Sequence, residues 1–401
     1  MTPRGYPLLI AGIGTWFGFW GAHMVLFQWL LVEILGASPE RVGTAQMAIS
    51  LPSLLFLLVG GATADRVDPR RLMVAIHLGS AALVAGLALW LALFELRFAA
   101  IIPYALAIGT LQAFGFPARD TLLSEVVRGS MSRAVAGTTL AQHAAQVGGS
   151  LLAGSAGLLG GVPVLGALVL LVAAGAPPMA RLPRRERTAH RDPLSLAELR
   201  AGVVEVFGSS ILFPVLLLAI ATGVLYVGPY LVVLPLLVRD VYHGGAGEMA
   251  VLNAMFPLGS VLGGLVIVWR GGLRRTGRAL ALGQVSASVC IAVLACNPPF
   301  AGAVAAVLGW GLSGALFINA GRTLFQSHAS EAHRARVLSV YTLGVMGGAP
   351  IGSLATGLVA APLGLHGTLA LDAALALAVA LAVSATTSLL HADEVREDDR
   401  P

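Results

Sequence analysis

The sequence contains no lysine, and charged residues of all kinds make up only 11% of its 401 residues. Soluble domains contain about 25% charged residues, so this composition excludes an ordinary globular protein. Hydrophobic residues make up 57% of the chain, and apolar runs of about 20 residues can span a bilayer as helices. The 25 basic residues, all arginine, lie in short breaks between apolar runs. That pattern indicates membrane topology and argues against a surface that binds nucleic acid.

The chain also lacks the short motifs of common enzyme classes. Its two cysteines, Cys290 and Cys296, are six residues apart on one apolar segment and point to different faces of a helix, which argues against a disulfide or a metal pair. The sequence has no HExxH, no CxxC, no Gly-x-Ser-x-Gly elbow and no P-loop. We therefore expect no enzymatic activity, no cofactor, no metal and no ATP hydrolysis as the energy source.

Twelve apolar runs alternate with short polar segments. They lie near residues 8–34, 43–63, 72–94, 98–117, 137–159, 162–180, 210–238, 249–269, 277–296, 299–320, 337–360 and 367–390. The first run continues to about Leu35, far beyond the roughly 7–15 apolar residues of a signal peptide. It is therefore predicted to be a retained first span.

The placement of arginine predicts the orientation in the membrane. If both termini are cytoplasmic, 22 arginines fall on the inner side and only Arg41, Arg97 and Arg239 on the outer side. Because inner loops are enriched in basic residues, we predict cytoplasmic N- and C-termini.

The second half of the chain repeats the first at a constant offset of 203 residues. The repeated pairs include Gly60-Gly61 with Gly263-Gly264, Arg119 with Arg322, Arg133 with Arg336, and Gly149-Ser150-Leu151 with Gly352-Ser353-Leu354. A duplicated membrane unit is a common plan of secondary transporters. We predict an all-α membrane protein with twelve transmembrane helices in two pseudo-symmetric six-helix halves, residues 1–180 and 210–392.

Residues 181–209 are predicted to be a cytoplasmic linker. Its first part is basic and contains proline, while Ser195 to Glu198 resembles a capping box. Leu196, Leu199, Val203 and Val206 follow at helical spacing, which predicts a short amphipathic helix on the inner membrane surface. This helix either coordinates the two halves or is an ordinary connector. Residues 393–401 are predicted to be a solvated acidic tail.

The loop after the second span carries the pattern Gly-x-x-x-Asp-Arg followed by a basic pair, in residues 61–71. It resembles the loop signature of the major facilitator superfamily. The resemblance implies that Gly61 packs two helices closely, that Asp65 is the carboxylate of a cytoplasmic gate, and that Arg66 and Arg70 are its basic partners. The chain departs from the common pattern at Asp68-Pro69. The plain alternative is that these charges only satisfy the membrane topology.

The repeat suggests further members of this gate. In the second copy Asp65 maps to Val268 and Arg66 to Trp269, so only the first copy keeps the carboxylate. Arginines close spans four and ten and precede span eleven at the same predicted face. We hypothesise an inner gate network whose members are Asp65, Arg66, Arg70, Arg119, Asp120, Arg322 and Arg336.

Three features together resemble one branch of the superfamily, the exporters of enterobactin and macrolides. They are the Ala-Asp-Arg loop, the run Phe116-Pro117-Ala118-Arg119, and the run from Gly348 to Ser353. Span five has no proline, so the Gly-Pro signature of drug/proton antiporters is not present there. The glycine-dense runs in spans five and eleven predict close helix crossings at a moving interface.

In the superfamily, spans one, four, seven and ten line the central cavity. Their polar and aromatic residues are the substrate candidates: Trp16, Trp20, His23, Phe27, Tyr104, Gln112, Tyr226, Tyr230, Trp310 and Asn319. An aromatic cavity with few charges suits a bulky amphipathic solute better than a sugar. The alternative for each aromatic residue is a position facing lipid or the membrane interface.

Ionisable residues within spans are candidates for function. His23, Glu33 and Asp372 are the candidates for proton coupling. His23 is equally compatible with neutral, hydrogen-bonded packing, and Glu33 at the outer end of its span with simple hydration. Proton coupling itself is implied by the resemblance alone.

The resemblance implies a proton-coupled exporter of a drug, macrolide or siderophore that works by alternating access. We expect a monomer in the bacterial inner membrane, whose partners are the bilayer, a small-molecule substrate and protons. The alternatives are an importer of a small nutrient and, in a different class, a membrane scaffold or sensor that transports nothing. The gate loop does not separate export from import, because importers carry it too.

Overall fold

The protein is described from a computed structural model, which covers the chain except residues 1–4, 127–130, 183–195, 274, 331–332 and 393–401. Within helices, the side chains of residues 57–66, 131–133, 135–136, 196–199 and 334–335 are also outside the description. The side chains of Gly61, Asp65 and Arg66, and the predicted cap at Ser195, therefore lie outside the described residues.

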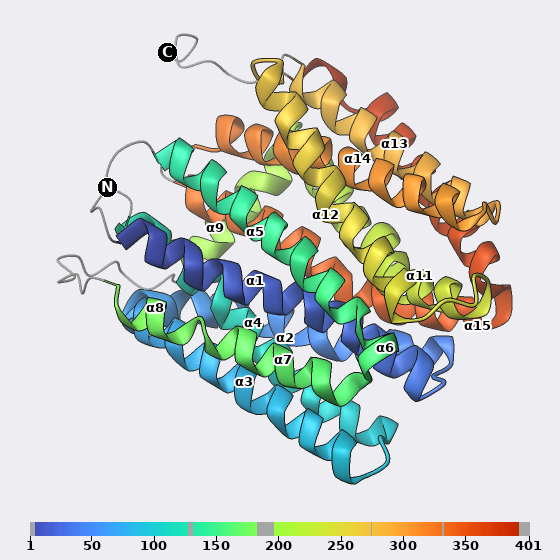
Figure 1. Cartoon of the computed structure of the whole chain (residues 1–401). Helices are drawn as coiled ribbons and strands as arrows, with labels where there is room; N and C mark the ends of the chain where they lie inside the picture. Colours follow the sequence, from blue (N-terminus) through green and yellow to red (C-terminus); the bar gives the residue numbers. More distant parts are fainter. Residues whose placement is uncertain (1–4, 127–130, 183–195, 274, 331–332, 393–401) are drawn as a thin grey trace. The chain divides into compact units, whose positions relative to one another are not determined.

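The first six predicted spans are helical (Figure 1). They are α1 (Gly5–Trp29) with a π-helical end (Leu30–Ile34), α2 (Pro39–Arg66), α3 (Pro69–Leu93), α4 (Phe98–Val126), α5 (Met131–Gly154) with the short α6 (Ala156–Leu159), and α7 (Gly161–Ala173) with α8 (Ala176–Ala180).

The remaining predicted spans and part of the linker are also helical and follow in the predicted order. They are α9 (Leu196–Gly208), α10 (Leu212–Thr222), a π-helix (Gly223–Val227), α11 (Gly228–Asp240), α12 (Ala246–Trp269), α13 (Thr276–Ala295), α14 (Phe300–His328), α15 (Arg334–Thr386) and a 3₁₀ turn (Ser388–His391). Nine helical stretches within the described residues are long and apolar enough to cross a membrane. The predicted all-α, twelve-helix membrane fold is confirmed.

Spans eleven and twelve join without a loop in α15. The helix is interrupted at Gly364, whose φ of 70° and ψ of 173° are not helical, two residues after Pro362. A left-handed φ strongly favours glycine, and proline disrupts the helical hydrogen bonds before it. The boundary predicted from the sequence between spans eleven and twelve lies at this same point.

The chain divides into two compact units. The first contains residues 1–193 and 235–254, and the second contains residues 194–234 and 255–401. In the first unit α1 packs on α5, α2 on α4 and α3 on α7. In the second, α13 packs on α14, and α10 and its π-helix pack on α15. The C-terminal end of α11, from Pro235, and the start of α12 thus belong to the first unit.

Glycine allows the same helix crossing in each unit. A Cβ on Gly149 of α5 would collide with the carbonyl oxygen of Gly18 in α1. A Cβ on Gly352 of α15 would collide with the backbone of Gly223 and Val224 in the π-helix. Gly149 and Gly352 are repeat partners, so the predicted close crossings of spans five and eleven are confirmed; their movement stays a prediction.

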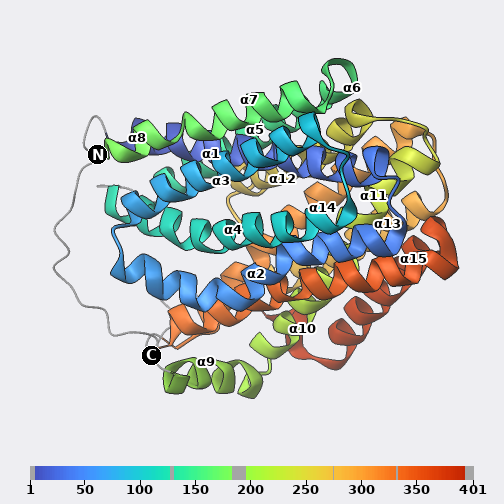
Figure 2. The same ribbon diagram turned by 90° about the horizontal axis from the view of Figure 1, so that it is seen from below.

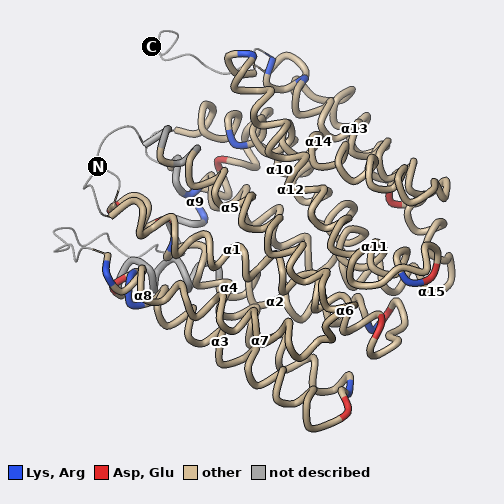
Figure 3. Tube along the Cα trace, in the orientation of Figure 1, with Lys and Arg blue, Asp and Glu red and all other residues tan. Residues whose placement is uncertain are grey.

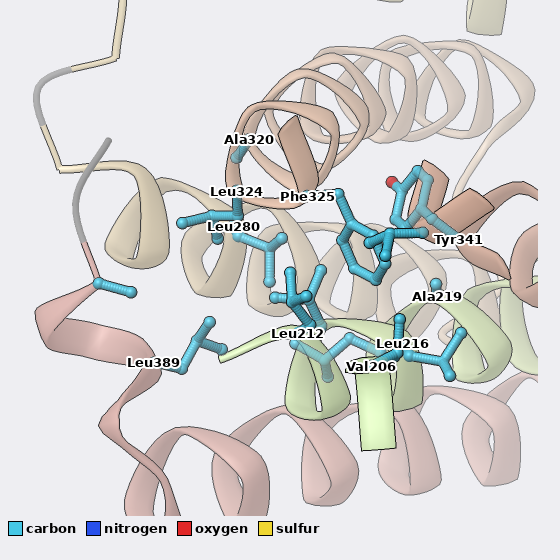
Figure 4. Packing of buried hydrophobic residues seen from close by; sticks show 14 of the residues in the cluster. Val206, Leu212, Leu216, Ala219, Leu280, Ala320, Leu324, Phe325, Tyr341 and Leu389 are labelled. Atoms are coloured by element: carbon cyan, nitrogen blue, oxygen red, sulfur yellow. The ribbon is translucent and has the colours of Figure 1, made fainter. Parts of the chain in front are cut away.

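The linker helix α9 packs on the core of the second unit. Val206 is fully buried in a cluster with Leu212, Phe325 and Leu389 (Figure 4), and Val203 packs against this cluster. Figure 2 shows α9 beside α10. The sequence assigns this apolar stripe to the membrane surface, but at Val203 and Val206 it packs on protein. An apolar stripe can pack on lipid or on apolar side chains of neighbouring helices, and the sequence pattern alone does not distinguish these two surroundings.

Charged residues are concentrated near helix ends and in loops, and the long middle segments of the helices are almost free of them (Figure 3). This distribution is what a bilayer requires, because a charge at the membrane centre is costly.

Candidate functional site

The first candidate site is an aromatic cluster on α1 and α4 of the first unit. His23 is 3% exposed, and its Nε2 lies 2.8 Å from the hydroxyl oxygen of Tyr104. The ring of His23 stacks on Trp20 at 5.2 Å and on Phe27 at 5.7 Å between centroids. We call Trp20, His23, Phe27 and Tyr104 the His23 cluster. It provides aromatic faces around one hydrogen-bonded polar pair.

Trp16 belongs to a different group, although it shares the predicted stripe. Its ring packs at 5.1 Å against Phe17 and at 5.3 Å against Phe116. Gly115 of α4 makes room for it, since a Cβ there would collide with the indole. The guanidinium of Arg119 lies 5.4 Å from the Phe17 ring. Trp16 therefore packs toward the end of α4 that carries Arg119.

The second candidate site surrounds Tyr226 in the π-helix of the second unit. The Tyr226 hydroxyl donates to the carbonyl oxygen of Gln284 at 2.9 Å and lies 2.8 Å from Oγ of Ser288. Trp310 of α14 lies 6.3 Å from the Tyr226 ring and 5.8 Å from the Tyr230 ring. Phe256 of α12 lies 5.3 Å from the Tyr230 ring and 6.3 Å from the Trp310 ring. We call Tyr226, Tyr230, Phe256 and Trp310 the Tyr226 cluster. Segments of π-helix occur frequently at functional sites.

The two clusters are related by the repeat. His23 and Tyr226 are 203 positions apart, and so are Phe27 and Tyr230. The polar partners differ, because His23 bonds to α4 whereas Tyr226 bonds to α13. Each half thus places one polar ring at the same position of its first span, but holds it from a different neighbour.

Gln284 and Ser288 were missed by the reasoning from sequence, which considered only spans one, four, seven and ten. Gln284 Nε2 donates to the carbonyl oxygen of Leu218 at 3.0 Å and to Oγ1 of Thr222 at 2.9 Å. The sequence does contain a signal, because these two polar residues lie one helical turn apart within an apolar span. The structure shows that both are buried.

The other cavity candidates lie outside both clusters. Gln112 is half-buried. Asn319 is exposed, and its amide donates to the carbonyl oxygen of Ala315 in its own helix at 2.7 Å. Their role in a substrate cavity stays a prediction.

The candidates for proton coupling differ in environment. Glu33 is exposed in the π-helical end of α1. Asp372 in α15 is 8% exposed, and its Oδ2 has no hydrogen-bond partner among the described residues. His23 has the Tyr104 hydroxyl as partner. Asp372 is therefore the buried carboxylate among the three.

In the first unit the predicted gate arginines contact local partners. Arg70 Nη1 donates to the carbonyl oxygens of Ala180 at 3.1 Å and Leu182 at 3.3 Å. Arg119 donates to Asp120 at 2.9 Å and, through Nη1, to Oε1 of Gln142 at 2.8 Å. These bonds tie α3 to α8 and α4 to α5 at the end of the unit where Arg70 and Arg119 lie.

In the second unit Arg322 is exposed near the end of α14, and Arg336 is half-buried at the start of α15. A Cβ on Gly202 of α9 would lie 2.9 Å from Cβ of Arg336, so the linker helix packs directly on this arginine. The joint network of seven gate residues stays a prediction.

The fold is that of a transporter of the major facilitator superfamily. Within it, the chain belongs to the family of transmembrane secretion effectors, whose model matches residues 7–400. This family is the group suggested by the resemblance to enterobactin and macrolide exporters. The superfamily is a class of transporters, and the chain is not an enzyme.

Solved structures share the fold at low sequence identity. The nucleoside transporter NupG has a TM-score of 0.77 and 12% identity over 96% of this chain and 99% of NupG. A bacterial homolog of the human lysosomal transporter Spinster, inward-facing and occupied, has a TM-score of 0.73 and 15% identity over 96% and 98%. An auto-inhibited peptide transporter of the POT family has a TM-score of 0.70 and 13% identity over 100% and 99%. No curated protein sequence matches the chain.

Proposed function

We propose that the protein is a secondary active exporter of a bulky, amphipathic small molecule such as a drug, macrolide or siderophore. The observation that carries this proposal is the His23 cluster, in which two aromatic side chains, Trp20 and Phe27, flank the polar pair of His23 and Tyr104 without a charged group in the cluster. Ligand sites are mostly apolar with a few well-placed polar groups. The description of the family as secretion effectors supports the outward direction.

Each cluster offers a substrate two kinds of contact in this proposal. At the His23 cluster, aromatic or apolar parts of the substrate stack on Trp20 and Phe27, and at the Tyr226 cluster on Tyr230. A hydroxyl, amine or carbonyl of the substrate exchanges hydrogen bonds with His23 or Tyr226. A sugar is a poorer fit, because it would leave many hydroxyl groups without polar partners.

Protons are the proposed coupling ion. Asp372 is the best supported carrier, because one of its oxygens lacks a hydrogen-bond partner among the described residues, and a buried membrane carboxyl in that state is costly to keep charged. His23 is the second candidate, since binding of substrate can replace its bond to Tyr104. Exposed Glu33 is the weakest of the three.

Transport proceeds by alternating access of two six-helix halves, residues 1–180 and 210–392. In the proposed orientation both termini are cytoplasmic, the protein is a monomer in the bacterial inner membrane, and Asp65 with its arginine partners closes the inner side. Import of a small nutrient is the alternative direction.

A growth experiment tests the proposed substrate class. A strain deleted for the gene is compared with its parent, and with the deletion strain complemented by the wild-type gene, across antibiotics and under iron limitation. Greater sensitivity to macrolides, or a loss of secreted siderophore, supports export. A growth defect that appears only when one nutrient is limiting, and that added nutrient relieves, would favour the importer.

A further inference from the structure

The first unit contains two segments from the second half of the sequence: the outer end of α11 and the start of α12, within residues 235–254. Both segments make polar contacts with the outer end of α1. These contacts involve Arg239 and Asn253, neither of which belongs to the aromatic clusters or to the predicted inner gate.

Arg239 binds the end of the first span. Its Nη1 donates to the carbonyl oxygens of Val32 and Ala37, both at 3.1 Å. Val32 lies in the π-helical end of α1, and Ala37 follows Gly36, whose φ of 53° turns the chain. Carbonyl groups at a helix C-terminus carry partial negative charge and lack partners within the helix. A guanidinium at this position therefore stabilises the end of the span.

Asp240 orients the arginine. Its two carboxylate oxygens accept from Nε of Arg239 at 2.5 Å and from Nη2 at 3.0 Å. The Arg239 side chain is 26% exposed, so both water and protein surround this pair. The bidentate geometry fixes the plane of the guanidinium and leaves Nη1 directed at the two carbonyl groups.

A second contact lies deeper. Asn253 of α12 donates from Nδ2 to Oε1 of Gln28 in α1 at 2.9 Å, and the two residues are 6% and 0% exposed. Amide pairs between membrane helices stabilise helix association modestly, because each also finds partners when the helices separate. Such a bond suits a contact that forms and breaks.

Close backbone packing accompanies these bonds. A Cβ on Gly154 at the end of α5 would lie 2.8 Å from Cβ of Ala250 in α12, and 3.5 Å from Cα of Gly247. The start of α12 therefore rests on α5 as well as on α1. Small residues at this surface allow a tight contact without a large side chain that locks it.

We infer that Arg239 with Val32 and Ala37, and Asn253 with Gln28, form an outer latch that is closed in this conformation and opens when substrate leaves on the outer side. The inference rests on the proposed transport function. Arg239 and Asn253 are positioning residues: they hold the outer ends of α11 and α12 on the first unit and touch no substrate.

The test measures access to the latch from outside. Met249 is fully buried one turn before Asn253, which bonds back to its carbonyl oxygen at 2.9 Å. Met249→Cys is introduced into a chain in which Cys290 and Cys296 are replaced by serine, and intact cells are treated with a membrane-impermeant maleimide. Arg239→Gln is expected to accelerate labelling about fivefold. The loss of one modest contact shifts the equilibrium between the closed and open latch by about this factor. Arg97→Gln, at an exposed arginine on the same predicted side of the membrane, is the control and leaves the rate unchanged.

Equal labelling rates in the Arg239→Gln, Arg97→Gln and parent chains would overturn the latch. If Arg239→Gln does not yield folded protein, Gln28→Ala replaces it with the same expected acceleration and the same overturning result. Labelling needs neither substrate nor a proton gradient. Faster labelling together with a failure of export would therefore refute the proposed function and leave the latch standing.

Discussion

Nε2 of His23 and the hydroxyl oxygen of Tyr104 lie 2.8 Å apart between two membrane-spanning helices of the first unit. The pair is enclosed by Trp20 and Phe27, so the hydrogen bond is shielded from bulk water. A substrate that enters this cluster has to compete with the bond or extend it. Removing this hydrogen bond therefore tests whether the pair takes part in substrate recognition.

Tyr104→Phe is expected to weaken substrate binding with little change in shape. The ring stays, but the imidazole loses its partner, which costs about 1–3 kcal/mol when a buried polar group is left unsatisfied. Binding of a labelled substrate to purified protein should weaken, and thermal unfolding in detergent should occur at a lower temperature. The control is Tyr6→Phe, which loses a bond to the carbonyl oxygen of Ala134 at 3.0 Å away from the cluster. Equal affinities in the two variants would remove Tyr104 from the site.

Asp372→Asn is expected to abolish transport driven by a proton gradient while substrate exchange without a gradient continues. The amide keeps the size of the side chain but cannot release a proton. The measurement compares gradient-driven accumulation with counterflow in proteoliposomes. Glu33→Gln is the control for loss of a carboxylate at an exposed position and should retain both activities. Gradient-driven accumulation at the wild-type rate in Asp372→Asn would assign coupling to another group.

Asp65→Asn is expected to reduce transport with little loss of folded protein, because the proposed inner gate loses its carboxylate. Transport in vesicles and the yield of monodisperse protein are measured together. Asp68→Ala is the control for a nearby carboxylate: Asp68 caps α3 by accepting from the Arg70 amide at 3.0 Å. Its loss should cost about 0.5–2 kcal/mol of stability without a specific transport defect. Full activity of Asp65→Asn would contradict the gate.

Docking of the linker helix is expected to depend on pH through Glu205. The carboxylate of Glu205 accepts from the Ser330 amide at 2.7 Å and the Ser330 hydroxyl at 2.9 Å, and Nδ1 of His333 lies 2.8 Å away. Partial burial acts to raise the pKa of Glu205, but these hydrogen bonds outweigh it and hold that pKa below its usual value. The contribution to stability is therefore present above the unfolded pKa of about 4.3 and is lost as the pH falls through the folded value.

The measurement is thermal unfolding of wild type and Glu205→Gln between neutral and acidic pH. The two curves should differ at neutral pH and converge only once the pH has fallen below the lowered folded pKa of Glu205, where the wild-type carboxyl also becomes neutral. Arg200→Gln, an exposed position on the same helix, serves as control. A difference that is constant across the pH range would show that the charge of Glu205 does not hold α9 in place.

The fold followed from the sequence because a bilayer imposes simple requirements. Apolar runs of span length became helices, and the break expected between the last two spans lies at Gly364, where proline and a left-handed glycine coincide. The repeated glycines at 149 and 352 correctly marked close crossings. These features depend on one segment, or on one pair of segments, and so are visible directly in the residue pattern.

The site was only partly predictable. Trp16 and His23 share one predicted stripe, yet Trp16 packs on Phe116 beside Gly115, whereas His23 pairs with Tyr104. The partner of Tyr226 came from α13, a span that the family pattern does not assign to the cavity. The placement of residues 235–254 in the first unit depends on packing between segments far apart in the chain. Such packing depends on helix rotation and tilt, which periodicity does not determine.

The central claim is tested most directly by transport into everted membrane vesicles with an acidic lumen, using a radiolabelled macrolide as probe and vesicles without the protein as the blank. In everted vesicles the lumen corresponds to the outside of the cell, so a proton-coupled exporter accumulates the probe there as protons leave. The account predicts accumulation that collapses when an ionophore removes the gradient and that is diminished in Tyr104→Phe. Accumulation confined to right-side-out vesicles, or accumulation that persists without the gradient, would contradict it.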